Sequence, residues 1–343
     1  MAKPVRAPLK ILMLQFKSLG DAVLMIPALR AIRDRHPDCA LHVLVSEAAA
    51  PLLRHSPLIT RLWSMPRVRG RARLSQTWPV IRALRRERFD LSADLGSNDR
   101  GALLSLLCGA KNRIGLVHSK GFLGRRLCYT RCIPPAPLDQ HETLRLLHVL
   151  SAWDVKPPSA VEINLHTDPH LDALASQILP KATVICHMGA GRPNRQWPVG
   201  HWAALHKLAA AAGYGLVFSM GQAPRERVLL EELRQNSPDV HVLPPMPDVG
   251  VFLAVLKRAR AIISGDTGPM HFAAALGVPT IALFGPSSPV QWGPVGEGHQ
   301  VLLGGRCTCD HRAHRCHSAS NCLSAISPER VMGCLQSILS PDQ

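Results

Sequence analysis

The fold is decided by one stretch of the chain, SGDTGPMHFAAALGVPTIALFG at residues 264–285. We expect a short apolar strand over residues 261–264 to lead into this stretch. A tight turn over residues 265–268 and then a helix should follow it. Pro269 stands where the first helical residue belongs, because its missing N–H costs nothing at that position. The other N–H groups of the first turn and the positive end of the helix dipole predict an anion-binding site beyond the strand.

The turn carries more polar residues than a helix cap needs. Asp266 and Thr267 can exchange hydrogen bonds with hydroxyl groups, Gly268 completes the turn, and His271 can donate to the same anion. The alternative is a well-capped strand-turn-helix without a ligand. Because capping asks for a Ser, Thr or Asp but not for Asp, Thr, Gly and His together, we interpret these four residues as a binding site.

Short apolar runs alternate with longer helical patterns along the chain, which predicts an α/β fold with parallel, doubly wound sheets. In the first half we expect strands at residues 10–15, 41–46, 60–64 and 91–95, and helices at 21–35, 76–88, 99–108 and 140–153. In the second half we expect strands at residues 182–187, 215–220, 240–243, 261–264 and 280–284, with helices such as 200–212 between them.

A proline-rich break at residues 156–159 and a polar run at residues 166–170 predict a linker. We therefore expect two Rossmann-like domains, residues 1–160 and residues 161–343, and a chain of 343 residues is long enough for two cores. Ligands of open parallel sheets bind at the carboxyl ends of the strands. Since Asp21 and Asp266 both follow such ends, we expect the two domains to face each other across one cleft.

Four segments in order resemble the signature of glycosyltransferase family 9, the ADP-heptose:lipopolysaccharide heptosyltransferases. They are ILMLQFKSLGDAVLMIPAL at 11–29, HMGAGRPNRQWPVGHW at 187–202, MGQAPRE at 220–226, and residues 264–285. The resemblance covers most of the chain. It implies the GT-B fold and an inverting transfer of heptose from ADP-heptose to a lipopolysaccharide core acceptor. The alternatives are a different nucleotide-sugar donor, a protein acceptor, or a basic nucleotide-binding module without turnover.

The resemblance places the catalytic base at Asp21, within KSLGD at residues 17–21. A base at this point would take the proton of the acceptor hydroxyl. Lys17 and Ser18 are expected to contact the acceptor. The alternative interpretation of Asp21 is a first-turn acid that only stabilises its helix.

The departing diphosphate needs positive charge or oriented dipoles. No Asp-x-Asp pair occurs in the sequence, so we expect neither a metal clamp nor a cofactor. The charge would come from the helix start at Pro269, from the backbone at Gly189 and from Arg195, which stands where the family usually has Lys. Glu226 resembles the carboxylate that binds the nucleotide ribose, although one residue is inserted before it, so that Gln222 could take part of that role; a surface acid is the alternative. We expect Trp197 to be a packing residue.

The formal net charge of +16 points to an anionic partner. Nine arginines lie between Arg61 and Arg88, with Glu87 and Asp90 as the neighbouring acids. The resemblance assigns this half to the acceptor, so Arg67 and Arg69 are expected to bind a lipid-linked oligosaccharide, and an anionic membrane surface fits the charge too. A solvated basic face is the alternative. Because aromatic residues are few and no nucleic-acid motif occurs, we expect no nucleic acid partner.

The chain shows neither an apolar run of about 18 residues nor an apolar signal segment, so we expect a cytoplasmic protein that is peripheral at the inner-membrane face. Its ten cysteines are too few for a secreted disulfide scaffold. Four of them fall in a Cys/His-rich loop over residues 306–322, and with its histidines they could form a structural zinc site. Reduced loop cysteines are the default interpretation of Cys307, Cys309, Cys316 and Cys322, and a reversible disulfide is the remaining alternative.

Overall fold

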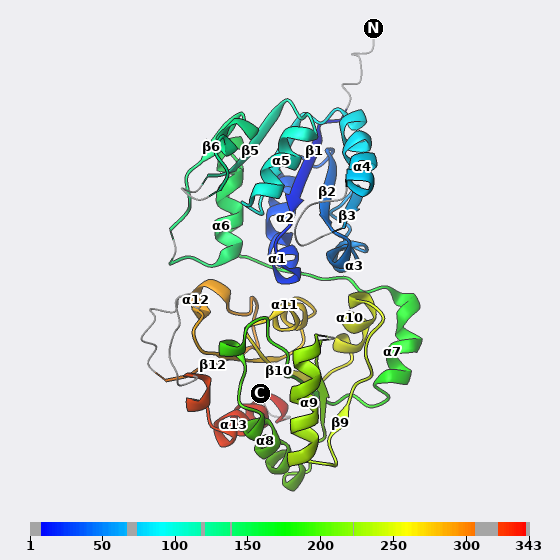
Figure 1. Cartoon of the computed structure of the whole chain (residues 1–343), viewed down its shortest axis with the longest axis vertical. Helices are drawn as coiled ribbons and strands as arrows, with labels where there is room; N and C mark the ends of the chain where they lie inside the picture. The colour runs from blue at the N-terminus through cyan, green and yellow to red at the C-terminus, as the bar shows by residue number, and fades with distance from the viewer. Residues whose placement is uncertain are drawn as a thin grey trace. The chain divides into compact units, whose positions relative to one another are not determined.

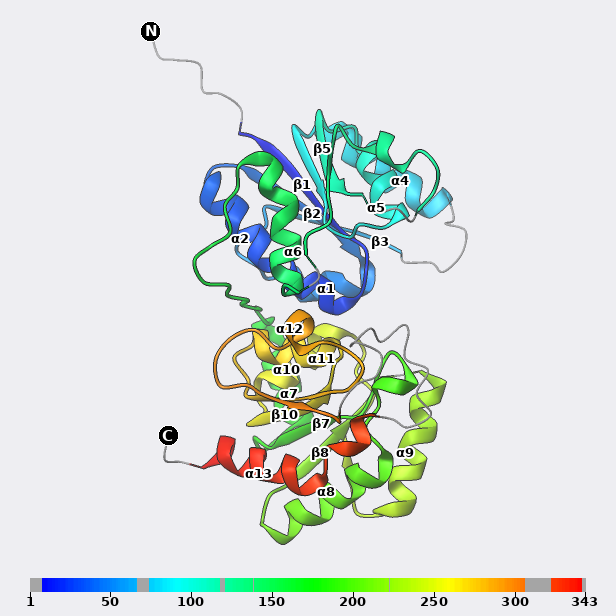
Figure 2. The ribbon, with the colours of Figure 1, turned by 90° about the vertical axis from the view of Figure 1, so that its left-hand side faces the viewer.

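The computed structural model describes residues 8–66, 74–117, 121–137, 139–221, 223–305 and 322–340. The chain divides into two compact units, Met1–Glu162 (unit 1) and Ile163–Gln343 (unit 2), and each contains one six-stranded parallel sheet (Figures 1 and 2). The sequence-based boundary lies between residues 160 and 161. The predicted fold class, α/β with two Rossmann-like sheets, is confirmed.

The sheet of unit 1 is ordered β3-β2-β1-β4-β5-β6. Its central strand β1 has the sequence KILMLQ, and five of its six residues are buried because helices cover both faces of a parallel sheet. The strands are β1 (Lys10–Gln15), β2 (Ala40–Ser46), β3 (Arg61–Met65), β4 (Leu91–Asp94), β5 (Asn112–Leu116) and β6 (Arg131–Ile133).

Helices cover both faces of this sheet. In Figure 2, α4 and α5 lie on one side of the strands and α2 and α6 lie on the other. The helices of unit 1 are α1 (Leu19–Leu24), α2 (Ile26–Arg35), α3 (Ala50–Leu53), α4 (Leu74–Glu87), α5 (Asp99–Leu107) and α6 (Glu142–Val149), and one turn of 3₁₀ helix, Leu150–Trp153, follows α6.

The expected single helix over residues 21–35 is wrong in one respect. Helix α1 begins two residues earlier, at Leu19, and ends at Leu24; Met25 separates it from α2, which begins at Ile26. The reason is Pro27, which has no N–H to donate to Val23 and so cannot continue the hydrogen-bond ladder of α1, although it fits the first turn of α2.

Unit 2 repeats the same winding. Its sheet is ordered β12-β11-β10-β7-β8-β9, which is the order of unit 1 read from the other edge. The strands are β7 (Val184–His187), β8 (Leu216–Ser219), β9 (His241–Val242), β10 (Ala261–Gly265), β11 (Thr280–Phe284) and β12 (Gln300–Leu303). The helices are α7 (Asp172–Ile178), α8 (Val199–Ala211), α9 (Pro224–Asn236), α10 (Val249–Lys257), α11 (Gly268–Ala275), α12 (Pro289–Trp292) and α13 (Pro328–Leu339).

Each sheet has one point at which the direction of winding reverses. In unit 1 it lies between β1 and β4, which pair in parallel with Ile11 opposite Leu91. In unit 2 it lies between β7 and β10, where Ala261 pairs with Val184. Because the connections leave such a pair of strands toward opposite faces, a crevice opens at their carboxyl ends, and ligands of doubly wound folds bind there.

Among the helices that the structure describes, none combines the length and the apolar composition that a bilayer crossing requires.

Candidate active site

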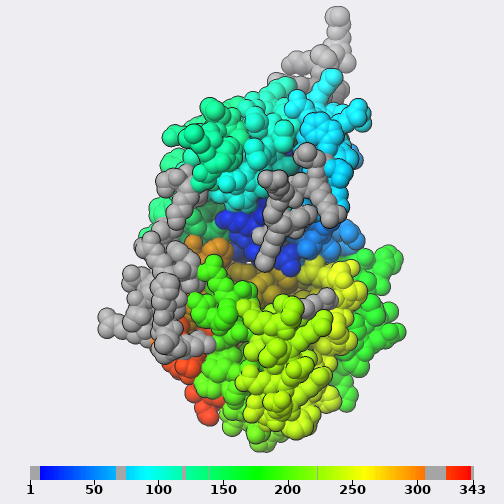
Figure 3. Space-filling view, in the orientation of Figure 1, coloured from blue at the N-terminus to red at the C-terminus, as the bar shows by residue number. Residues whose placement is uncertain are grey.

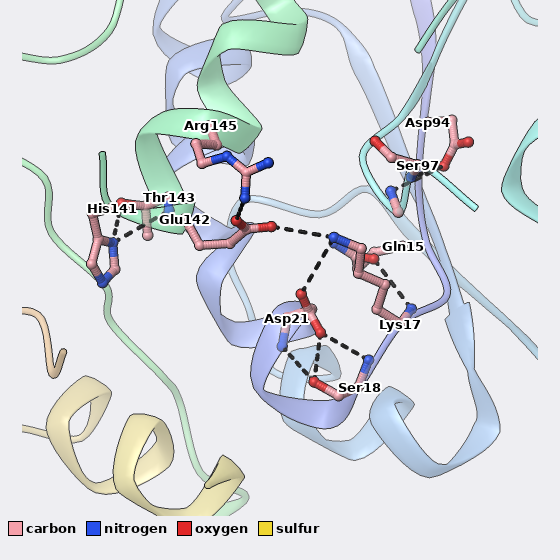
Figure 4. Close-up of polar contacts among 11 residues, drawn as sticks. Gln15, Lys17, Ser18, Asp21, Asp94, Ser97, His141, Glu142, Thr143 and Arg145 are labelled. Carbon is pink, nitrogen blue, oxygen red and sulfur yellow. Dashed lines mark hydrogen bonds and ion pairs between the residues drawn. The ribbon is translucent and has the colours of Figure 1, made fainter. Parts of the chain in front are cut away.

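Asp21 lies in the first turn of α1, directly beyond the carboxyl end of β1 (Figure 4). Ser18 caps this helix, and its backbone N–H and its hydroxyl donate to Oδ2 of Asp21 over 2.9 Å and 2.5 Å. The backbone N–H of Asp21 donates to the Ser18 hydroxyl in return, which completes a capping box. Ser18 thus contacts Asp21, its contact with the acceptor stays a prediction, and the capping interpretation of Asp21 is correct for one of its two oxygens.

The second carboxylate oxygen of Asp21 is not used by the cap. Oδ1 has no hydrogen-bond partner among the described residues, and Asp21 is only 6% exposed. The nearest charge is Nζ of Lys17, 4.0 Å from Oδ1. A buried oxygen whose carboxylate is held rigidly by its other atom has the geometry of a proton acceptor for a bound hydroxyl group.

Lys17 is held by a residue that the sequence reasoning missed. Its Nζ lies 3.2 Å from Oε1 of Glu142 in the first turn of α6, and Glu142 also forms an ion pair with Arg145, one turn further along the same helix (Figure 4). Glu142 is 2% exposed. The only local signal was an acid at the start of a predicted helix, and nothing near it in the sequence points to Lys17.

A second buried carboxylate ends the neighbouring strand. Asp94, the last residue of β4, accepts hydrogen bonds from the N–H groups of Gly96 and Ser97 and from the hydroxyl of Tyr129, 2.7 Å away. Complete burial raises the pKa of Asp94 to about 6, against the opposing effect of its donors and of Arg125. Gly101 must be a glycine here, because a Cβ would lie 2.3 Å from an Asp94 oxygen.

In unit 2, the carboxylate of Glu226 lies against two glycines at the ends of β7 and β8. A Cβ at Gly189 would come within 2.7 Å of its Oε1, and a Cβ at Gly221 within 2.4 Å of its Oε2. Oε2 is buried, and none of the described residues meets it with full hydrogen-bond geometry. Burial raises the pKa of Glu226, an effect that the neighbouring Arg225 and the backbone N–H groups of Ala223 and Gly221 oppose. Glu226 is thus a desolvated acceptor and not a surface acid.

Two further groups complete this edge of the sheet. His187, the last residue of β7, shares a hydrogen bond of 3.0 Å with the Ser219 hydroxyl at the end of β8, and burial lowers its pKa to about 4. His187 is therefore neutral at physiological pH. Its Nε2 would lie 2.9 Å from a Cβ at Gly189, so a side chain at this glycine would fill the space beside Glu226.

Arg195 and Asp266, which the sequence predicted as two separate contacts to the ligand, form an ion pair. Nη1 of Arg195 lies 2.8 Å from Oδ2 of Asp266, directly after β10. Nε of Arg195 has no hydrogen-bond partner within the described part of the chain. The pair therefore fixes the guanidinium beside the start of α11 while it leaves a donor for a ligand.

The start of α11 follows the predicted turn. Thr267 is the N-cap residue, but its side chain makes no capping hydrogen bond, and its hydroxyl lies 3.1 Å from that of Ser264. Gly268 and Pro269 are the first two residues of the helix. His271, two residues after Pro269, is buried. The first-turn N–H groups of α11 thus remain directed at the end of β10.

The remaining predicted residues lie outside these two groups of contacts. Trp197 is buried and donates to the carbonyl of Ile326 over 2.9 Å, which confirms its expected packing role. Cys322 is half-buried and described. Outside the described residues lie Arg67, Arg69, Gln222, Cys307, Cys309 and Cys316.

Two sheets of this winding in one chain are the architecture of the GT-B fold. The chain is similar to the crystal structure of glycosyl transferase family 9 from Veillonella parvula (TM-score 0.84, 20% identity, 98% of this chain and 99% of that chain). It is also similar to the E. coli heptosyltransferase WaaC with ADP (TM-score 0.72, 22% identity, 96% and 100%).

The model of glycosyltransferase family 9 (heptosyltransferase) matches residues 77–322, and the chain belongs to this family. Lipopolysaccharide heptosyltransferase 1 of Pseudomonas aeruginosa is 28% identical to it over 310 residues, which cover 88% of this chain and 85% of the relative. The family expected from the four sequence segments is confirmed. The protein is a glycosyltransferase.

Proposed function

We propose that this protein transfers a heptose from ADP-heptose to a lipopolysaccharide core acceptor with inversion at the anomeric carbon. The family and the relative of Pseudomonas aeruginosa, a lipopolysaccharide heptosyltransferase, support the sugar and the acceptor. The E. coli heptosyltransferase WaaC has been solved both with ADP and with ADP-2-deoxy-2-fluoro heptose, which supports the donor.

The observation that carries the proposal is the state of the Asp21 carboxylate. Ser18 fixes its Oδ2, and Oδ1 is buried without a hydrogen-bond partner among the described residues. In the reaction, the acceptor oxygen attacks the anomeric carbon and the bond from that carbon to the phosphate oxygen breaks. Oδ1 of Asp21 takes the hydroxyl proton, and ADP leaves with the bonding electron pair.

The edge of the unit 2 sheet suits the nucleotide part of the donor. A ribose hydroxyl can donate to the unsatisfied Oε2 of Glu226, and the glycines at positions 189 and 221 give it room. The diphosphate fits the N-terminus of α11, where backbone N–H groups and Arg195 supply donors. Asp266, Thr267 and His271 line the same point, and we assign them to the donor as well.

Metal-free catalysis is part of the proposal. The charge that develops on ADP would be stabilised by the guanidinium of Arg195 and by the dipole of α11, both of which are fixed before the reaction. The zinc site considered for Cys307, Cys309, Cys316 and Cys322 has no part in this chemistry.

The acceptor is assigned to unit 1. Lys17 lies beside the proposed base, and α4 carries exposed arginines that continue the basic run containing Arg67 and Arg69. Because lipopolysaccharide cores carry phosphates and carboxylates on a lipid, we propose that the enzyme works at the cytoplasmic face of the inner membrane.

The test is transfer by the purified protein from ADP-heptose to a heptose-deficient core acceptor, measured by mass spectrometry with and without EDTA. Asp21→Asn should lower turnover by about 10²-fold or more and leave donor affinity within a few fold, because it removes the base and keeps its shape. Asp34→Asn, an exposed acid of α2, is the matched control. Turnover of Asp21→Asn at the wild-type rate would refute the base, and transfer only from another nucleotide sugar would refute the donor.

A further inference from the structure

Unit 1 exposes an unusual amount of apolar surface at one place. Among the described residues, eleven large hydrophobic side chains are exposed, and six of them belong to three neighbouring segments of unit 1. Leu123 is fully exposed and Leu127 is 79% exposed. The six are Trp78 of α4, Leu103 and Leu106 of α5, and Phe122, Leu123 and Leu127 in and before the 3₁₀ turn Arg125–Cys128. Isolated exposed side chains need no explanation, but a cluster of this size does.

Helix α5 is in contact with both of the other segments. Nη1 of Arg85 in α4 donates to the carbonyl of Leu107 at the end of α5. Arg125 of the 3₁₀ turn forms an ion pair of 3.7 Å with Asp99 at the start of α5. Asp99, Leu103 and Leu106 share one face of α5, because residues four and seven apart lie above one another on a helix. Figures 2 and 3 show α4 and α5 side by side on one face of unit 1.

Helix α4 is amphipathic toward this surface. Thr77, Ile81 and Leu84 are buried against the sheet. Trp78, which is 55% exposed, is followed at intervals of four residues by the exposed Arg82 and Arg86. A helix with a buried apolar face and an outer face of arginines and one tryptophan is suited to the boundary between lipid headgroups and acyl chains.

We propose that this docking face, formed by Trp78, Arg82, Arg86, Leu103, Leu106, Phe122, Leu123 and Leu127, binds an anionic phospholipid bilayer. Leu123 and Leu127 would enter the acyl region while the arginines of α4 contact the headgroup phosphates. The inference rests on the proposed function, which requires a lipid-linked acceptor, and it adds the surface that reaches the membrane.

Charge complementarity identifies a bilayer as the occupant. Residues 74–117 and 121–131 carry ten basic residues against four acidic ones. Three of these acids form ion pairs, Asp99 with Arg125, Glu87 with Lys10 and Arg61, and Asp90 with Lys111, and the fourth, Asp94, is buried. The apolar surface also continues inward. A pocket of about 620 Å³ opens beside Leu123 and is lined by Val117, Phe122, Ile133 and Pro134, with Arg126 among its residues.

The test is binding of the full-length protein to sedimenting vesicles of phosphatidylethanolamine and phosphatidylglycerol at a ratio of about 3:1, compared with phosphatidylcholine vesicles. Leu123→Asp/Leu127→Asp should lower the partition coefficient for the anionic vesicles by about 10-fold or more, since each leucine that enters the bilayer contributes a large hydrophobic free energy of binding. Arg82→Gln/Arg86→Gln should lower it by several fold at low salt and have little effect at high salt.

The matched control is Val228→Asp/Val290→Asp, which changes two valines of unit 2 that are 61% and 63% exposed. It should bind vesicles as the wild type does. Equal loss in the control, unchanged binding of the leucine variant, or a dimer that the leucine variant converts to a monomer would each overturn the proposal.

Transfer to a deacylated, soluble core acceptor separates this inference from the proposed function. The leucine variant should transfer to the soluble acceptor at the wild-type rate. If the wild type binds vesicles through this face but transfers no heptose, the proposed function fails alone; if it transfers heptose but the face is not needed for binding, the docking face fails alone.

Discussion

Nζ of Lys17 lies 3.2 Å from Oε1 of Glu142, although 125 residues separate the two in the sequence. The same ammonium group is 4.0 Å from Oδ1 of Asp21. Glu142 therefore holds the lysine beside the proposed base and keeps it from closing onto that oxygen. Arg145 forms an ion pair with the other oxygen of Glu142. The network therefore runs from α6 toward the point between β1 and β4 at which the winding of the sheet reverses.

Glu142→Gln should lower kcat by about 10-fold and leave the KM for ADP-heptose unchanged. The reason is that Lys17, released from Glu142, moves onto Oδ1 of Asp21 and competes with the acceptor hydroxyl. Steady-state kinetics with the donor and the acceptor varied in turn measures this. Glu87→Gln, which also breaks two ion pairs of unit 1 but lies away from Asp21, should keep its kcat; a similar fall in both variants would mean that Glu142 acts only through stability.

Arg195→Gln should weaken the binding of both ADP and ADP-heptose by about 1.5–3 kcal/mol, the usual cost of a lost hydrogen bond to a charged group. Asp266→Asn removes the ion-pair partner but keeps the guanidinium, so ADP should bind with unchanged or higher affinity. Isothermal titration calorimetry gives both values. Arg192→Gln, in the same loop and exposed, is the control. Equal loss of ADP affinity in the Arg195 and Asp266 variants would show that the arginine acts only through its pair.

Glu226→Gln should raise stability at neutral pH and weaken ADP binding. A carboxyl group whose folded-state pKa lies above its unfolded value destabilises the fold once it ionises, so the penalty is absent at acid pH and complete above the folded-state pKa. The melting temperature of the Gln variant should therefore exceed that of the wild type at pH 7, and the difference should vanish near pH 4. A lower melting temperature at pH 7 would contradict the desolvated state of Glu226.

Gly101→Ala should destabilise unit 1, whereas Gly333→Ala should stabilise unit 2 by about 0.5–1 kcal/mol. Both glycines are helical, but a Cβ at Gly101 would meet the buried Asp94 carboxylate at 2.3 Å, and a Cβ at Gly333 in α13 meets nothing within 4 Å. In the second case only the intrinsic preference of the helix for alanine remains. Urea unfolding of the two variants tests the contrast, and equal effects would rule out the close contact with Asp94.

Local patterns predicted the parts of the fold that local chemistry decides. The bounds of β1 and β11 agree with the sequence prediction because both strands are short, apolar runs buried on both faces. Strands β5, β6 and β12 were missed, because NRIGL, RCI and QVLL lie toward the edges of their sheets and carry polar or exposed residues. Their pairing with a neighbouring strand, which the sequence does not display, makes them strands.

In the site, too, the contacts between residues close in sequence were predictable and the contacts between distant residues were not. The cap of α1 and the turn before α11 follow from spacing, so Asp21 and Thr267 lie where they were expected. The pairs Lys17 with Glu142 and Arg195 with Asp266 join residues that are far apart in the chain. Only the folded sheet brings such residues together, and this is why neither pair could be predicted from the sequence.

The matching strand orders of the two sheets have a consequence for synthesis on the ribosome. All six strands of the first sheet are encoded before Glu162, and none is supplied by the second half of the chain. Each sheet starts from its central strand, β1 or β7, and receives its neighbours outward as they emerge. The first sheet can thus close while the second is still being translated, so a nascent chain never has to keep six apolar strands unpaired until a partner arrives from the far terminus.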